Sequence, residues 1–411
     1  MVELPDATWP STAVSPNLSA SVERPALVSV IMSVLNGEPY LTRAVDSILN
    51  QTYPYFEFII IDDGSTDNTW QILTHYAQAD SRVVLIRNEH NMGYTRSLNK
   101  GIAQAQGEFV ARQDADDISH CERLARQIAF LIDHPQVGLL GTLPQFIDAN
   151  DAVLPIARYA LLTDNKSIQE ELYNSNCFRH GSIIMRRTCL DMVGVYNADL
   201  EPSEDYDLWL RLAEVTELAN LPEPLYLYRE HMASESSKRR FRQMYHKAVA
   251  LEQAVQRRFA TAPAADKWVL VGRDFLRAAV LAWIDGNHAA AQEALMRAQT
   301  ADGRLLERHD QLATITHRYL TREPVEKAIP LTETLFGELL PLTPPLTHIK
   351  AQLLSELHME AVFAAQSAQQ NAQIDAHLWP GIRYNPRWLR NRGILSLLLR
   401  RTFSFRRSSR S

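Results

Sequence analysis

Runs rich in Val and Ile alternate with amphipathic stretches over the first quarter of the chain. Leu27–Leu35 and Phe56–Ile61 have the composition of strands that are buried on both faces of a sheet. The expected elements are strand Leu27–Leu35, a helix carrying Leu41, Val45, Ile48 and Leu49, strand Phe56–Ile61, a helix ending at Tyr76, strand Val83–Arg87, helix Ser97–Gln106 closed by Gly107, and strand Glu108–Arg112. Strands and helices that alternate with short links predict a parallel, doubly wound α/β sheet.

Polar side chains follow these predicted strands at the point where each strand ends. Asn36 follows the first strand, Asp62 and Asp63 follow the second, and the run Asp114–Asp117 follows the fourth. Sheets of this kind bind ligands at the carboxyl ends of their strands. Because a buried carboxylate is costly unless it is paired or metal-bound, this clustering predicts a ligand site at that edge of the sheet.

The pattern changes to Ala, Leu, Gln and Arg at helical spacing from about Gln243. Trp268–Ile284 and Ala291–Ala301 predict a helical hairpin, in which Ala291 and Ala298 resemble the small residues of a tetratricopeptide unit. The predicted parts are a loose N-terminal arm over 1–26, a catalytic domain over 27–240, a helical domain over 241–382 and a basic tail over 383–411.

The charge of the chain is unevenly distributed. The net charge is −6, yet the tail from Arg383 to Ser411 holds nine arginines and no acidic residue, which leaves −15 on the rest. Such a tail favours contact with anionic lipid, and a merely solvated basic end is the alternative. The net charge gives no reason to expect binding to nucleic acid.

The three cysteines have no metal-binding spacing and are expected to be reduced thiols. The first residues lack the basic and apolar regions of a secretory signal, and no run approaches the roughly 20 apolar residues of a membrane span. The expected location is therefore cytoplasmic, with peripheral attachment to the inner face of the cell membrane through the tail.

The sequence Asp114-Ala115-Asp116 at a strand end is suited to the chemistry of a sugar nucleotide. Two carboxylates can hold Mg²⁺ or Mn²⁺ while phosphate oxygens and water complete the coordination. The alternative is a helix start with acidic first-turn residues, a role expected for Asp117. After the second strand, Asp63 can accept the imide N–H of uracil, or the segment can be a plain turn.

A third acidic group, Glu204-Asp205-Tyr206-Asp207, stands far along the chain. An inverting glycosyl transfer needs a base that takes the proton of the acceptor hydroxyl, and a carboxylate near the donor can do this. The alternative is a helix N-terminus whose acids are favoured by the helix dipole.

These segments together resemble the family 2 glycosyltransferases, which have the nucleotide-sugar-binding fold called GT-A. The match covers about 205 residues, from Leu27 to His231, through segments that occur in the order of the family. They are Val28–Asn36, Ser47–Pro54, Ile61–Asp67, Asn91–Gly93, Leu98–Gly101, Gly107–Asp117, Glu204–Trp209 and Tyr228–His231.

The resemblance implies a role for each matching residue. Asp63, with Asp62 beside it, would contact the base, Asp114 the ribose or a metal-bound water, Asp116 the metal, and Asp205 would be the catalytic base. His231 would add a metal or diphosphate contact, and His180 would line the acceptor side. Further candidates are Asn36 and Arg96 for the nucleotide, Glu204 beside the base, and Arg112 and Arg229 as phosphate contacts or structural ion-pair partners. Leu35 stands where many relatives have Tyr, so a stack on the nucleobase is expected to be absent.

The leading hypothesis is inverting transfer of a sugar from a UDP-sugar to a glycan or lipid-linked saccharide in cell-surface polysaccharide synthesis, with Mn²⁺ or Mg²⁺. A nucleotidyltransferase would need a Gly-rich, basic phosphate loop after the first strand, and Asn36–Pro39 supplies none. A catalytically silent scaffold, with the helical region binding a partner, is opposed by three costly carboxylate groups.

Overall fold

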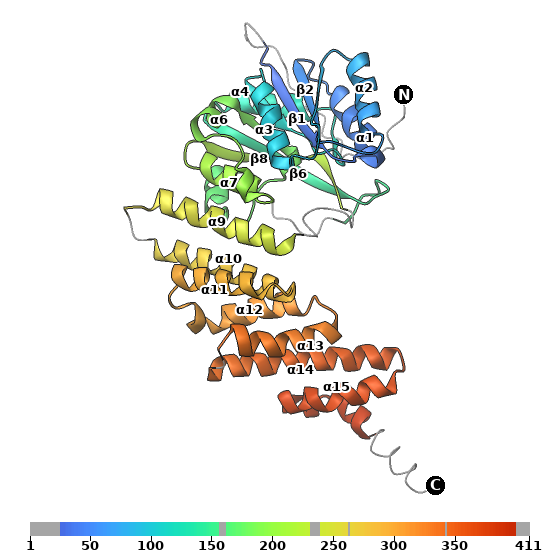
Figure 1. Ribbon diagram of the computed structural model, residues 1–411, viewed down its shortest axis with the longest axis vertical. Coiled ribbons are helices and arrows are strands. Elements are labelled where there is room, and N and C mark those ends of the chain that lie inside the picture. The colour runs from blue at the N-terminus through green and yellow to red at the C-terminus, as the bar shows by residue number, and fades with distance from the viewer. Residues whose placement is uncertain (1–24, 156–161, 231–238, 262–263, 342, 400–411) are drawn as a thin grey trace. The chain divides into compact units, whose positions relative to one another are not determined.

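The computed structural model describes residues 25–155, 162–230, 239–261, 264–341 and 343–399. The chain forms two compact units, Met1–Lys267 and Trp268–Ser411 (Figure 1). In the part that the structure describes, no helix is both long and apolar enough to cross a bilayer.

The first unit is built on an eight-stranded sheet of order β3-β2-β1-β4-β7-β6-β8-β5. Its strands are β1 (Val28–Val34), β2 (Phe56–Asp62), β3 (Val83–Arg87), β4 (Phe109–Arg112), β5 (Ile118–Ser119), β6 (Val137–Ile147), β7 (Ile184–Arg186) and β8 (Glu217–Arg229). The strands β1 to β4 are parallel and lie within one or two residues of their predicted limits.

The predicted parallel sheet is confirmed for β1 to β4, whereas the second half of the sheet is mixed, with β6 and β8 parallel to each other. The strand β7 runs antiparallel to both β4 and β6, and β5 runs antiparallel to β8. Strands of three and two residues are too short to carry a periodic pattern, so hydrophobic periodicity could not reveal them. The resulting mixed sheet flanked by helices is the GT-A arrangement that the family resemblance implied.

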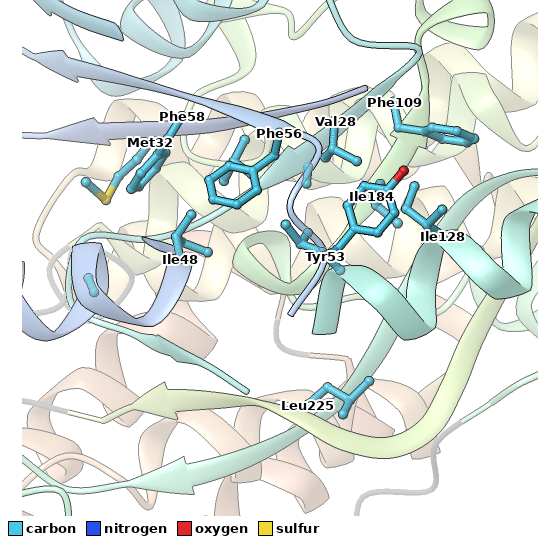
Figure 2. Close-up of a cluster of buried hydrophobic side chains, with 14 of the residues drawn as sticks. Val28, Met32, Ile48, Tyr53, Phe56, Phe58, Phe109, Ile128, Ile184 and Leu225 are labelled. Carbon is cyan, nitrogen blue, oxygen red and sulfur yellow. The ribbon is translucent and has the colours of Figure 1, made fainter. Parts of the chain in front are cut away.

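Helices cover both faces of the sheet. Those of the first unit are α1 (Glu38–Leu49), α2 (Thr69–Ala79), α3 (Tyr94–Gln104), α4 (Arg123–Asp133), α5 (Asn165–Glu171), α6 (Arg187–Val193), α7 (Glu204–Leu212) and α9 (Arg240–Arg258). Apolar side chains of α1, α2 and α4 pack with Val28, Met32, Phe56 and Phe58 in one core, part of which Figure 2 shows. The helix α3 packs on the other face, where Gly101 lies against Ile61.

Gly107 does not have the predicted role of closing a helix. The helix α3 ends at Gln104, two residues earlier than expected. The amide of Gly107 donates to Ser29 Oγ at 2.8 Å, and a Cβ at position 107 would lie 2.6 Å from the Ser29 nitrogen. The glycine is therefore required by the close approach of the chain to β1 rather than by the helix end.

The second unit is helical throughout its described residues. Its helices are α10 (Ala265–Ile284, which begins in the first unit), α11 (His288–Ala301), α12 (His309–Leu320), α13 (Val325–Thr334), α14 (Pro344–Ser367) and α15 (Asn371–Tyr384). The predicted hairpin is formed by α10 and α11, with Gly272 against the carbonyl of Ala298 and the side chain of Asn287 capping α11. Both Ala291 and Ala298 are buried, as small residues at a close helix contact must be.

Candidate active site

The predicted polar clusters meet at one edge of the sheet. The strands β2, β1 and β4 are neighbours, and all three point the same way. Asn36, Asp63 and Asp114 therefore follow adjacent strand ends, as the sequence predicted. The backbone ladder continues past β2 and β4, because Asp63 N donates to Val34 O and Gln113 N donates to Ile31 O. The edge is thus set by regular strand pairing up to the residues that carry the chemistry.

Asp63 organises the loop that leads from β3 to α3. Its side chain is 2% exposed. Its Oδ1 accepts hydrogen bonds from Asn88 Nδ2 at 2.8 Å and from the amide of Met92 at 2.9 Å. Its Oδ2 accepts from the amide of Gly93 at 3.1 Å. Asp62, also buried, accepts from the amide of Ser65 at 3.0 Å and pairs with Arg87 at 3.3 Å.

Asn36 fixes the loop after β2 from the neighbouring strand end. Its backbone has φ +53°, a left-handed conformation that Asn tolerates better than most residues. Its Oδ1 accepts from the amide of Thr66 at 2.9 Å, and its own amide donates to Ser65 Oγ at 2.9 Å. Arg96, in the first turn of α3, is exposed and makes a long 3.4 Å contact with the carbonyl of Met92.

Asp114 is held by a buried arginine. Arg112 is fully buried and its Nη2 contacts Asp114 Oδ1 at 2.6 Å. The hydroxyl of Tyr94 donates to the same oxygen at 2.8 Å and also contacts Arg112. Burial raises the pKa of Tyr94 well above its usual value, although the charge of Arg112 acts in the opposite direction. Arg112 is thus the ion-pair partner of Asp114, one of the two roles predicted for it.

His180 connects this cluster to α7. Its Nε2 accepts from Arg112 Nε at 3.3 Å and lies 2.8 Å from the hydroxyl of Tyr196. Its ring packs edge-on against Tyr94, Tyr196 and Trp209, and Trp209 belongs to α7. Burial and the charge of Arg112 lower the pKa of His180 well below its usual value. The imidazole is therefore neutral, and it packs between Arg112, the partner of Asp114, and Trp209 of α7.

Asp117 does not start a helix, contrary to the sequence expectation. It precedes β5, and α4 begins six residues later at Arg123. Asp117 is 1% exposed and accepts the amide of Arg229 at 2.7 Å. Burial, and then the charges of Asp116 and Asp114, raise its pKa well above the usual value. Its carboxyl group thus ties the acidic loop to β8.

Arg229 holds the same loop through its side chain. Its Nε donates to the carbonyl of Asp116 at 2.7 Å, and its Nη1 donates to the carbonyl of Asp148 at 2.8 Å and pairs with Asp151 at 2.6 Å. Its guanidinium is buried. These contacts are those of a structural ion-pair partner, which was one of the two predicted roles.

The candidate base stands at the N-terminus of α7. Asp205 Oδ2 accepts from Asn176 Nδ2 at 2.7 Å, and its Oδ1 accepts from the amide of Tyr206 at 2.6 Å. Burial raises the pKa of Asp205 to about 6, and the charge of Asp114 acts in the same direction. Burial and the charge of Asp205 raise the pKa of Glu204 to about 8. Asp114, 91 positions away in the sequence, is therefore close enough for its charge to influence the ionisation of Asp205.

Sequence reasoning missed three residues that shape this site. Asn176 holds Asp205, and the hydroxyl of Tyr226 accepts from the amide of Asp114 at 3.2 Å. At Gly181 a Cβ would lie 1.8 Å from the Tyr226 hydroxyl and 2.6 Å from Asp114 Oδ2. The available signals were the alternation of Tyr226 and Tyr228 with leucines, and a glycine directly after His180.

Asp114 and Asp116 are the described side chains suited to a metal. In the described ranges, no three side chains of His, Cys, Asp or Glu gather closely enough to hold an ion. His231, the third predicted contact, lies outside the described residues. Asp114 and Asp116 are both partly exposed on one loop. Mg²⁺ is commonly bound by one or two carboxylates together with phosphate oxygens, so this pair fits a metal that arrives with a diphosphate.

The chain is similar to known glycosyltransferases. A family model described as glycosyl transferase family 2 matches residues 29–194. The O-antigen biosynthesis glycosyltransferase WbnJ of Escherichia coli is 33% identical over 214 residues, 51% of this chain and 81% of that protein. The UDP-Glc:alpha-D-GlcNAc-diphosphoundecaprenol beta-1,3-glucosyltransferase WfgD of Escherichia coli is 30% identical over 186 residues, 45% of this chain and 69% of that protein. The solved structure of S. aureus TarS 1-349 in complex with UDP-GlcNAc aligns with a TM-score of 0.48 at 19% identity, over 84% of this chain and 89% of that one.

Proposed function

The chain belongs to glycosyl transferase family 2, and on that premise we propose that it moves one sugar from a UDP-sugar to a glycan or lipid-linked saccharide in cell-surface polysaccharide synthesis. The transfer inverts the configuration at the anomeric carbon. The observation that carries this proposal is Asp205, a partly exposed carboxylate at the start of α7 whose pKa is raised to about 6, in part by the charge of Asp114.

Two relatives support the choice of substrates. WfgD is named for a UDP-Glc donor and a diphosphoundecaprenol-linked acceptor, and WbnJ is named for O-antigen biosynthesis. A lipid-linked acceptor would bring the enzyme to the cytoplasmic face of the membrane that holds the lipid. We therefore include a peripheral location at the inner face of the cell membrane in the proposal.

The reaction is a single displacement with one base. Asp205 takes the proton of the acceptor hydroxyl while that oxygen forms a bond to the anomeric carbon, and the bond from that carbon to the UDP oxygen breaks. A base with a pKa near the working pH is well matched to this transfer. Asn176 and the amide of Tyr206 each occupy one acceptor position of the carboxylate and orient it, which leaves about two of its four lone-pair positions for the hydroxyl.

Glu204 assists the base by remaining neutral. With its pKa raised to about 8, it is protonated at pH 7 and adds no second negative charge beside Asp205. This keeps Asp205 in the ionised form that a base requires, since a neighbouring carboxylate charge would raise its pKa further.

The donor is proposed to lie across the three strand ends. Asp63 and Asp62 are assigned to the nucleobase side, with Asn36 shaping the same loop and Arg96 as an exposed cation. Asp114 is assigned to the ribose. Arg112 and His180 are proposed to be positioning residues. Arg112 holds Asp114, and His180 packs against α7. Their polar groups already contact each other and the hydroxyls of Tyr94 and Tyr196.

Asp114 and Asp116, joined by His231, would hold the Mn²⁺ or Mg²⁺. When bound there, the ion would supply positive charge that stabilises the departing diphosphate. Arg112 and Arg229 prepare this loop for it, because they fix its backbone and one oxygen of Asp114.

A screen of nucleotide sugars tests the proposal. UDP-Glc, UDP-GlcNAc, UDP-Gal and GDP-Man would each be tested by calorimetric binding and by hydrolysis, with Mn²⁺ or with EDTA. We expect a UDP-sugar to bind and to be hydrolysed only with the metal, and Asp116→Ala to abolish that turnover. Asp191→Ala, at an exposed position of α6, is the matched control. Absence of binding by every nucleotide sugar, with or without metal, would exclude the proposed function.

A further inference from the structure

The helix α15 has two different sides. Ile374, Leu378 and Ile382 are buried in a cluster that includes residues of α14. Trp379 lies outside this cluster with 62% of its surface exposed. Arg383, one helical turn later, is exposed and lies on the same side as Trp379. The outward side of α15 therefore combines a large aromatic ring with a positive charge.

The segment after α15 repeats this division. In the 3₁₀ turn Pro386–Arg390, Trp388 packs against the buried cluster, and its Nε1 donates to Ser355 Oγ at 3.0 Å. Leu389 is instead 42% exposed and is flanked by the exposed Arg387 and Arg390. The inward ring anchors the turn, and the outward leucine has no place in that core.

The helical stretch over 392–399 shows the same pattern again. Its inward residues Ile394, Leu397 and Leu398 belong to the buried cluster or pack against it. Arg392, Leu395 and Leu399 recur at the three- and four-residue spacing of one helix face, and all three are exposed. We name the six outward residues Trp379, Arg383, Leu389, Arg392, Leu395 and Leu399 the C-terminal face.

Asp375 is exposed one helical turn before Trp379, and beyond it the charge of this region has one sign. Among the described residues, none of Arg383, Arg387, Arg390 and Arg392 makes an ion pair, and each is exposed. No acidic residue occurs after Asp375, and five more arginines follow residue 399. Such a surface repels a second copy of itself. Exposed leucines neither pair with phosphates nor stack on bases, whereas leucine and tryptophan are the residues that enter the boundary of a bilayer.

We infer that the C-terminal face lies on an anionic membrane surface. Trp379, Leu389, Leu395 and Leu399 enter the boundary between headgroups and acyl chains, and the arginines meet lipid phosphates. The contact surface therefore begins on α15, before the basic tail that the sequence indicated. The inference rests on the proposed function in one respect, namely that a lipid-linked acceptor requires the enzyme at a membrane.

The test is binding of the full chain to vesicles in the absence of donor and acceptor. Sedimentation would compare phosphatidylcholine vesicles with vesicles containing about one third phosphatidylglycerol. We expect binding to the anionic vesicles, weakened at least tenfold by Leu395→Ser/Leu399→Ser and by Arg383→Gln/Arg392→Gln. The control variants are Met296→Ser, at an equally exposed apolar position of α11, and Arg304→Gln, at an exposed arginine, and both should bind like the wild type.

Two results would overturn the inference. One is failure of the wild type to bind anionic vesicles. The other is undiminished binding by the leucine variant, which would mean that the vesicle is held by the charges of the tail alone. Helical content by circular dichroism verifies that each variant is folded. Sugar transfer to a water-soluble acceptor separates the two proposals: vesicle binding without any transfer contradicts the function, and transfer without vesicle binding contradicts the inference.

Discussion

The two units bury charged groups in different ways. In the second unit the buried carboxylates pair with arginines close in sequence: Asp274 pairs with Arg273 and Arg277, and Asp302 pairs with Arg308. The first unit also has local pairs, such as Asp207 with Arg211 and Asp114 with Arg112, but other carboxylates there have partners from distant parts of the chain. The backbone amide of Arg229 donates to Asp117 across 112 positions, and the side-chain amide of Asn176 donates to Asp205 across 29.

This difference separates charges that stabilise a helix from charges that form a site. Local pairs cost little ordering, because the helix already places their members together. The distant contacts of the first unit require the sheet to be formed. One carboxylate of the first unit, Glu204, is incompletely satisfied, since its Oε2 has no hydrogen-bond partner among the described residues. Such groups persist where the reaction needs them.

The largest expected effect is that of Asp205→Asn on transfer. An amide cannot take the acceptor proton, so kcat should fall by about 10³-fold, the order expected for loss of a general base. Donor binding by calorimetry should be unchanged. Asp207→Asn is the matched control on the same turn, because Asp207 pairs with Arg211 at 2.8 Å. That variant should lose stability with transfer largely retained, and near-normal transfer by Asp205→Asn would show that another group is the base.

The pH dependence of the wild type should follow the same group. Asp205 must be ionised to act as a base, and burial raises its pKa to about 6. The ratio kcat/KM is therefore expected to fall about tenfold per pH unit below pH 6 and to level off above it. Initial rates at saturating metal between pH 5 and 8 measure this. A flat profile across pH 6 would contradict the assignment.

The substitutions Gly181→Ala and Gly303→Ala compare how tightly the two units pack around a glycine. In the first unit the new Cβ would collide with the Tyr226 hydroxyl and with Asp114 Oδ2, so we expect about 1–3 kcal/mol of lost stability and a loss of donor binding. Gly303→Ala in the second unit meets nothing within 4 Å and should leave both unchanged. Thermal unfolding and donor titration check the pair. Equal, small effects at the two positions would mean that the acidic edge can relax.

Asp274→Asn should affect stability alone. Asp274 is fully buried, while the side chains of Arg273 and Arg277 keep 15% and 20% of their exposure. The cost is therefore expected at about 2 kcal/mol, below that of a fully buried pair. Urea unfolding measures the loss, and the transfer rate should remain at the wild-type value. A matching loss of transfer would indicate that the buried charges of this unit also serve the reaction.

The sequence revealed the site where its geometry is local to a strand end. Asp63 and Asp114 could be placed together because parallel strands end at a common edge. Asp117 was misassigned because Asp-Asp-Ile-Ser matches a helix start, whereas a two-residue strand pairs it with β8 from far along the chain. Asn176, Gly181 and Tyr226 acquire their roles only through such distant contacts. The glycine after His180 and the alternation of tyrosine with leucine marked two of these positions, but a local pattern does not identify the distant partner of either.

The smallest expected effect is a change in the local stability of the two units when the pH is lowered. His358 packs against His377, with 2.9 Å between their Nδ1 atoms, and burial lowers the pKa of His358 to about 4. Because the folded pKa lies below the unfolded value of about 6.5, its contribution is complete above pH 6.5 and is lost as the pH falls towards 4. Glu204 has a raised pKa, so the folded state holds its proton more tightly and acid favours the fold around α7.

Lowering the pH from 7 to 5 should therefore loosen α14 and α15 while α7 becomes more protected. Hydrogen exchange of the full chain, corrected for the intrinsic dependence of exchange on pH, measures both regions in one sample. His358→Phe should remove the response of α14 and α15 and leave that of α7 unchanged. Parallel changes in both regions would show that global unfolding, rather than these two buried groups, governs the response. Opposite changes would show that protonation of His358 destabilises α14 and α15, while protonation of Glu204 stabilises the fold around α7.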